Sequence, residues 1–120
     1  MEKAHKKLKA WQEAIALAKS VYQVTERLPA EERFCLASQM RRAAISVASN
    51  IAEGAARSGE RDSLQFFIIA RSSLSELDTQ AVLCSELRLL AASDISLLSS
   101  HIDTEDALLS GLIRFKRKGR

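Results

Sequence analysis

The fold is decided by one stretch in the first half of the chain, SQMRRAAISVASNIAEGAAR, residues 38–57. Its apolar residues recur at steps of three and four, which is the spacing of one face of an α-helix. They form two neighbouring stripes, which are Met40, Ala44, Val47, Ile51 and Ala55, and then Ile45, Ala48 and Ala52. Two stripes cover more of the circumference than a surface helix needs, and the many alanines permit close approach by a neighbour. We therefore expect a central helix.

The same periodicity continues on both sides of this stretch. It predicts helices over about residues 8–28, 60–90 and 94–117, in addition to 38–57. The predicted inward face of the first helix consists of Leu8, Trp11, Ile15, Ala18, Val21 or Tyr22, Val24 and Leu28. Pro29 ends this helix, because the residue before a proline is pushed out of the helical region. No segment has the alternation of a strand.

The fold class follows from four helices joined by short connections. A chain of 120 residues has the length of one domain, residues 1–120, and 47% hydrophobic with 28% charged residues suits a globular protein. We expect an all-α domain, an antiparallel up-down-up-down four-helix bundle whose apolar stripes share one core.

The net charge of +3 is unevenly distributed. Residues 1–10 carry +3 and residues 114–120 carry +5, which leaves −5 for the rest. In an up-down bundle both termini and the turn between the second and third helices lie at the same end. That end gathers Lys3, Lys6, Lys7, Lys9, Arg57, Arg61, Arg114, Lys116, Arg117, Lys118 and Arg120. Such a cluster is able to bind the phosphates of a nucleic acid, or it serves only to keep the protein soluble. Few aromatic residues lie among these charges, so stacking on the bases of a single strand has little support.

The sequence contains no recognisable catalytic, cofactor or metal motif. The one Glu-x-x-His, from Glu2 to His5, lies in a lysine-rich terminus and has no second copy, as a di-iron bundle requires. No nucleophile elbow and no glycine-rich phosphate loop is present. We therefore expect a protein that is not an enzyme and that uses no cofactor and no metal.

The two cysteines and the N-terminus indicate the cellular compartment of the protein. Cys35 and Cys84 lie far apart, on or beside apolar stretches, and we expect buried free thiols, with a disulfide between helices as the less favoured alternative. The N-terminus lacks an apolar signal core, and no apolar run is long enough for a membrane span. These observations favour the cytoplasm.

A polar stripe along residues 38–57 is predicted to face polar residues of the third helix. The set consists of Arg42, Ser46, Asn50, Glu53, Arg71, Ser72 and Glu76. A hydrogen-bonded network that fixes helix register or a subunit contact is the favoured interpretation. A ligand or reaction site, or a solvated stripe, is also compatible with the pattern.

Several stretches resemble one family. LASQMRRAAISVASNIAEG at residues 36–54 is similar to the signature of the bacterial four-helix-bundle 23S ribosomal RNA intervening-sequence proteins. The resemblance extends through WQEA at 11–14, LPAEER at 28–33 and FIIARSSLSEL at 67–77. It implies an up-down bundle that assembles into homopentamers. The accessory protein of diversity-generating retroelements, a relative that pairs with a reverse transcriptase and binds nucleic acid, belongs to the same family.

The resemblance and the charge pattern together give two functional hypotheses. The first is a non-enzymatic homo-oligomer, a pentamer by resemblance, whose basic end binds RNA, DNA or a nucleic-acid-processing protein, with no membrane involved. The alternative is a protein-interaction scaffold without direct nucleic-acid contact. A third hypothesis, an enzyme that uses Glu53 or Glu76, has little support.

Overall fold

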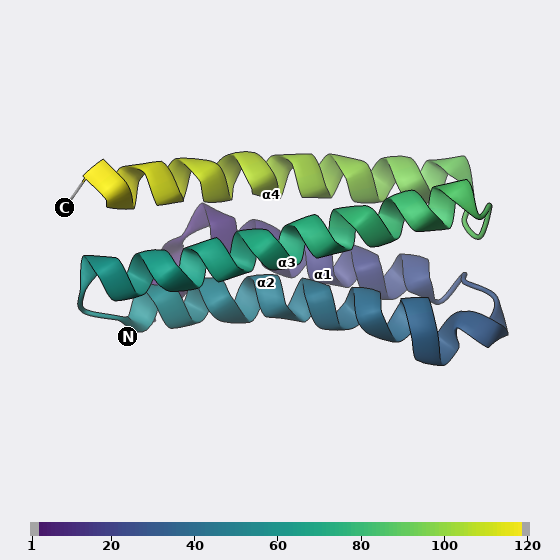
Figure 1. The fold of residues 1–120 in the computed structure, drawn as a ribbon, viewed down its shortest axis with the longest axis horizontal. Coiled ribbons are helices and arrows are strands. Elements are labelled where there is room, and N and C mark those ends of the chain that lie inside the picture. The colour runs from purple at the N-terminus through teal and green to yellow at the C-terminus, as the bar shows by residue number, and fades with distance from the viewer. Residues whose placement is uncertain (1–2, 119–120) are drawn as a thin grey trace.

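Four long α-helices make up the computed structural model, which describes residues 3–118. They are α1 (Lys9–Thr25), α2 (Ser38–Ala56), α3 (Glu60–Glu86) and α4 (Ala92–Lys118). Figure 1 shows them side by side along the longest dimension of the molecule, 45 Å. Each helix packs against two others in the cyclic order α1, α2, α3, α4. The predicted all-α bundle is confirmed, and residues 3–118 contain no strand.

The connection from α1 to α2 is itself helical. A short 3-10 segment, Ala30–Glu32, is followed by one π-helical turn, Arg33–Ala37, which runs directly into α2. α1 ends at Thr25, three residues before the predicted limit. The Thr25 hydroxyl donates a hydrogen bond of 2.6 Å to the Val21 carbonyl and occupies an acceptor in the last turn.

The third helix ends at Glu86, where residue 90 was predicted, because a C-terminal capping motif interrupts it. Arg88 adopts the left-handed conformation with a φ of 55°. The Leu89 N–H then donates to the Cys84 carbonyl, and the Arg88 N–H donates to the Ser85 carbonyl. This is the Schellman arrangement, usually made by glycine. Arginine at this position gave no sequence signal for the stop.

The core is lined by small residues on α1 and α2. The buried face of α2 includes Met40, Ala43, Ala44, Val47, Ala48, Ile51 and Gly54. The prediction of a central helix was wrong, because α2 packs against two neighbours, as each of the other long helices does. Ile45, expected in a second buried stripe, is 47% exposed. The predicted inward face of the first helix is confirmed at Val21, Val24 and Leu28, which are buried, but it was wrong in the first half of α1. There Ala10, Ala14 and Leu17 are buried, whereas Ile15 is exposed and Trp11 is half-buried beside α2.

The two cysteines have different environments. Cys84 is buried, with its sulfur 3.8 Å from the Met40 sulfur, as expected. Burial raises the pKa of the Cys84 thiol, and the Glu32 carboxylate adds to the shift. The prediction for Cys35 was wrong, since Cys35 is exposed on the π-helical turn. Both thiols are free.

Candidate nucleic-acid interface

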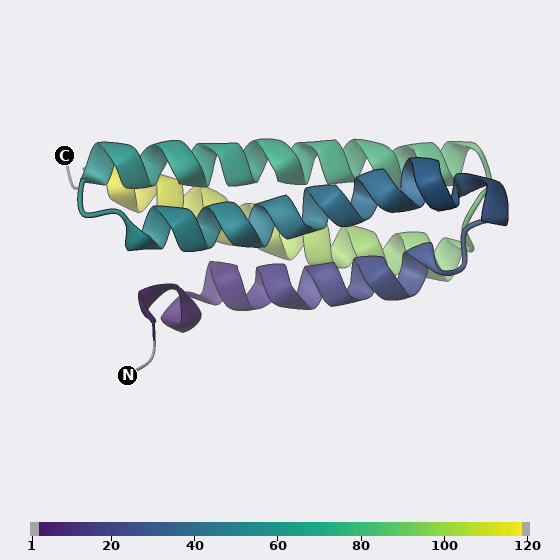
Figure 2. The same cartoon turned by 90° about the horizontal axis from the view of Figure 1, so that it is seen from below.

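Three segments distant in sequence meet at one end of the bundle. These are the first short helix η1 (Ala4–Lys7), the turn between α2 and α3, and the end of α4. Figures 1 and 2 show all three toward the same end, with η1 beside the last part of α2. We name this the basic end. Its exposed cationic side chains are those of Lys3, Lys6, Lys7, Lys9, Arg57, Arg61, Arg114, Arg117 and Lys118.

Two cations of the basic end already have partners. The Lys116 ammonium, half-buried, lies 3.3 Å from a carboxylate oxygen of Glu60. The Arg57 guanidinium lies 3.0 Å from Glu53 and stacks on the Phe66 ring, 4.7 Å from its centroid. Among residues 3–118, the other cations of the basic end form no ion pair within 4.0 Å. Arg120 lies outside the described residues.

An aromatic side chain missed by the sequence analysis lies among these cations. Phe115 is 70% exposed in the last turns of α4, between Arg114 and Lys116. The buried stripe of α4 passes through Leu109 and Ile113, so Phe115 falls outside it by helical spacing. This position outside the buried stripe was the sequence signal that could have identified Phe115 as exposed. An exposed ring beside free cations is able to stack on a nucleic-acid base.

The polar stripe of α2 forms a hydrogen-bonded seam with α3. The hydroxyls of Ser46 and Ser73 share a hydrogen bond of 2.8 Å, and the Asn50 amide donates to the Ser46 hydroxyl and carbonyl. The Arg42 guanidinium donates to Glu76 at 3.2 Å. The partner of Ser46 is thus Ser73, whereas Ser72 is exposed.

The remaining members of the stripe lie apart from this seam. Arg71 is half-buried, and the Glu53 carboxylate pairs with Arg57 along the same helix. The carboxylates of Glu53 and Glu76, the two considered for catalysis, therefore accept hydrogen bonds from arginine side chains at the surface. The Arg42–Glu76 pair joins α2 to α3, whereas the Glu53–Arg57 pair lies within α2.

Within residues 3–118, no group of three or more His, Cys, Asp or Glu side chains is placed to hold a metal ion. The His5 ring packs edge-on against Trp11, 5.0 Å between centroids, and Glu2 lies outside the described residues. None of the helices in the described range is long and apolar enough to cross a membrane.

One ionisable group in the core was not found from the sequence. Glu105 of α4 is fully buried, and neither carboxyl oxygen has a hydrogen-bond partner in the described chain. Burial, and secondarily the Glu13 carboxylate, raises its pKa from 4.5 to about 9. Glu13 in turn lies 2.7 Å from His101 Nδ1. Glu105 is therefore a neutral acid at pH 7.

Comparisons with known proteins give one result. The family model described as 23S rRNA-intervening sequence protein matches residues 6–111. No curated protein matches the chain. The matched range includes α1, α2, α3 and most of α4, and it ends before Phe115 and the last cations of the basic end.

Proposed function

We propose that this chain, which belongs to the 23S rRNA-intervening sequence protein family, binds nucleic acid through its basic end. The observation that supports this most is the meeting of η1, the α2–α3 turn and the end of α4 at one end of the bundle. Cations from three separate segments form one surface there. Multiple free lysines and arginines displace counterions from phosphates, which favours binding without sequence preference.

The geometry at the end of α4 favours a single strand. Arg114, Arg117 and Lys118 are exposed within one turn of Phe115. Phosphates bind to the cations while a base stacks on the ring, the combination that single-strand binders use. The C-terminus of α4 also carries the negative end of the helix dipole, which stabilises these cations in the unbound protein.

The test is charge reversal of Arg114, Arg117 and Lys118 to Glu. Lys116 is kept, because its ammonium pairs with Glu60. We expect affinity for labelled single-stranded RNA and DNA, measured by fluorescence anisotropy at low salt, to fall about 100-fold or more, since three contacts become repulsive. The control reverses Lys19 and Arg88, exposed cations away from the basic end that form no ion pair within residues 3–118. It lowers the net charge by 4, where the triple reversal lowers it by 6. Equal losses in both variants would contradict a localised interface.

An apolar groove favours a second role, as a protein-interaction scaffold that forms the oligomer. The groove, about 290 Å³, lies between α1 and α2, with Trp11, Ile15 and Ala18 on one side and Ile45, Ala48 and Ala52 on the other. Ile15 and Ile45 are 38% and 47% exposed. Exposed isoleucines in one groove mark a contact surface. By resemblance to the family, the partner is a second copy of the chain and the assembly is a homopentamer.

Light scattering tests this role. We expect a mass several times 13.3 kDa at micromolar concentration. Ile45→Glu should convert it to monomer, because the carboxylate would be buried without a partner. Lys19→Glu, an exposed change on α1 outside the groove, is the control. A wild-type monomer at that concentration would exclude the scaffold role and leave the nucleic-acid proposal untouched.

A further inference from the structure

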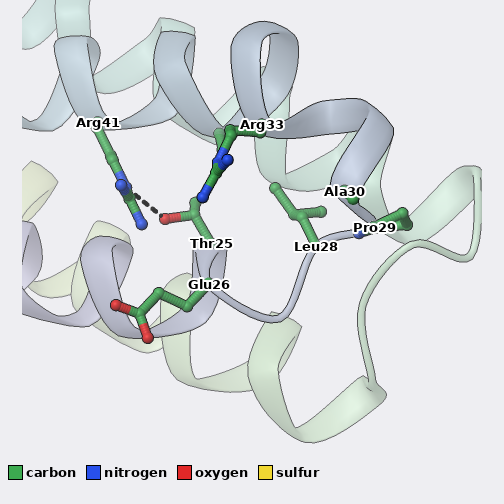
Figure 3. A pocket seen from close by; sticks show the side chains of 8 residues that line it. Thr25, Glu26, Leu28, Pro29, Ala30, Arg33 and Arg41 are labelled. Carbon is green, nitrogen blue, oxygen red and sulfur yellow. Dashed lines mark hydrogen bonds between the residues drawn. The ribbon is translucent and has the colours of Figure 1, made fainter.

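A hollow of about 530 Å³ lies at the end of the bundle opposite the basic end, where the chain crosses from α1 to α2. Figure 3 shows it from close by. Thr25 lines it from the end of α1 and Arg41 lines it from α2. The crossing between the two helices contributes Glu26, Leu28, Pro29, Ala30, Arg33 and Ala37. The hollow thus combines two guanidinium groups and one carboxylate with the apolar side chains of Leu28, Pro29, Ala30 and Ala37.

Arg41 is held rigidly in this lining. Its Nε donates to the Thr25 hydroxyl at 2.9 Å, and its Nη2 donates to the Tyr22 carbonyl at 3.3 Å. The guanidinium carbon also lies 4.5 Å from the centroid of the Tyr22 ring. These contacts use two of the five N–H donors, so the remaining donors have a fixed direction. A fixed donor group loses little entropy when it binds a ligand.

Arg33 supplies the second guanidinium. It comes from the π-helical turn, and in Figure 3 its side chain extends into the hollow toward Thr25. Its guanidinium carbon lies 5.9 Å from the centroid of the exposed Phe34 ring. Within residues 3–118, neither Arg33 nor Arg41 has a carboxylate within 4.0 Å. Two unneutralised cations therefore face one space.

Two backbone carbonyls and one carboxylate lie around the hollow. The Val21 and Tyr22 carbonyls, at the end of α1, accept hydrogen bonds from Thr25 and Arg41. Glu26 also lines the hollow; it is exposed, and in Figure 3 its carboxylate lies below the Arg41 guanidinium, without an ion pair within 4.0 Å among residues 3–118. The lining thus carries two guanidinium groups against one carboxylate.

We propose that this hollow binds a small organic oxyanion, a phosphate or carboxylate group on an apolar body. Guanidinium groups bind both head groups through paired, charge-assisted hydrogen bonds. Leu28, Pro29 and Ala37 contact the apolar body. The volume lies within the range of small-molecule sites, roughly 300–1,000 Å³. The site is separate from the basic end and does not depend on nucleic-acid binding.

The test is a titration of the full chain with phenyl phosphate, benzoate and inorganic phosphate, followed in ¹H–¹⁵N NMR spectra. We expect saturable shifts of the Nε–H signals of Arg33 and Arg41 with phenyl phosphate or benzoate. Inorganic phosphate should bind at least about fivefold more weakly, because it lacks the apolar body. The tighter of the two organic probes identifies the head group.

Arg33→Gln is the decisive variant, because the Arg33 side chain makes no hydrogen bond in the described chain and its removal should leave the fold unchanged. We expect the dissociation constant of the tighter organic probe, phenyl phosphate or benzoate, to be at least about tenfold higher, because a charge-assisted contact is lost. Arg27→Gln is the matched control: Arg27 pairs with Asp94 outside the hollow, and the constant should change less than about twofold.

Three outcomes would overturn the proposal. One is an unchanged constant in Arg33→Gln, one is equal binding of inorganic and phenyl phosphate, and one is a set of shifts confined to the basic end. The variant with Arg114, Arg117 and Lys118 reversed separates the two sites. It should retain the shifts at Arg33 and Arg41 even though nucleic-acid binding is lost.

Discussion

Glu105→Gln is expected to stabilise the bundle by about 4 kcal/mol at pH 8, the largest effect that we predict for a single substitution. Glu105 is fully buried and both its oxygens lack partners within the described chain. The wild-type protein must keep this carboxyl protonated in order to fold, which becomes costly as the pH rises. Glutamine has nearly the same shape and no proton to take up.

The direction of the pH dependence follows from the two protonation states. In the unfolded chain the carboxyl loses its proton near pH 4.5, whereas in the folded chain its pKa is about 9. Between these values folding takes up a proton, so this contribution to stability is complete below pH 4.5 and is lost as the pH rises toward 9. The expected slope is about 1.4 kcal/mol per pH unit.

Urea denaturation at pH 6 and pH 8 measures this slope. The wild type should lose about 2–3 kcal/mol over the interval relative to Glu105→Gln. Asp106→Asn, a neighbouring exposed carboxylate, serves as the control and should keep the wild-type slope. Identical pH dependence in the wild type and in Glu105→Gln would show that Glu105 is ionised or solvated in the folded protein.

Gly54→Ala is expected to destabilise the protein by about 1–3 kcal/mol, although alanine is the better helix former by about 1 kcal/mol. A Cβ atom at residue 54 would lie 2.6 Å from Cε1 and 2.9 Å from Cδ1 of Phe67. Phe67 is buried in the core, so its ring cannot swing into solvent. The glycine is therefore required by the close packing of α2 against α3.

Gly111→Ala provides the matched comparison for thermal or urea unfolding. Gly111 is also inside a helix, but an added Cβ would meet no atom within 4 Å. The same change should therefore stabilise α4 by about 0.5–1 kcal/mol. Phe67→Leu should recover part of the loss in Gly54→Ala, since the clash is with the far edge of the ring. Stabilisation at both glycines would contradict the packing explanation.

The helices themselves could be predicted because their periodicity and turn residues agree. Ser58 and Gly59 separate α2 from α3 as expected, and α2 continues through Gly54 to Ala56. The first half of the α1 face could not be predicted correctly, because alanines fill the core positions there and let the helices approach closely. The larger Trp11 and Ile15 lie over the resulting edge. Size alone was a misleading guide to burial there.

The sites were predictable to the extent that topology decides them. Alternating helices bring the terminal lysines and arginines to one end, which required no side-chain detail. Glu105 shares the spacing of Leu98, Ile102 and Leu109, yet its charge argued for the surface. The convergence of Arg33 and Arg41 depends on the π-helical turn, whose path has no simple sequence pattern.

The salt dependence of single-stranded RNA binding is the most direct test of the basic end. The logarithm of the association constant should fall linearly with the logarithm of salt concentration between roughly 50 and 400 mM, with a slope of about −3 or steeper if four or more phosphates are contacted. Reversal of Arg114, Arg117 and Lys118 should make the slope shallower by about 2. A flat wild-type line, or the same slope in both proteins, would contradict phosphate binding at this surface.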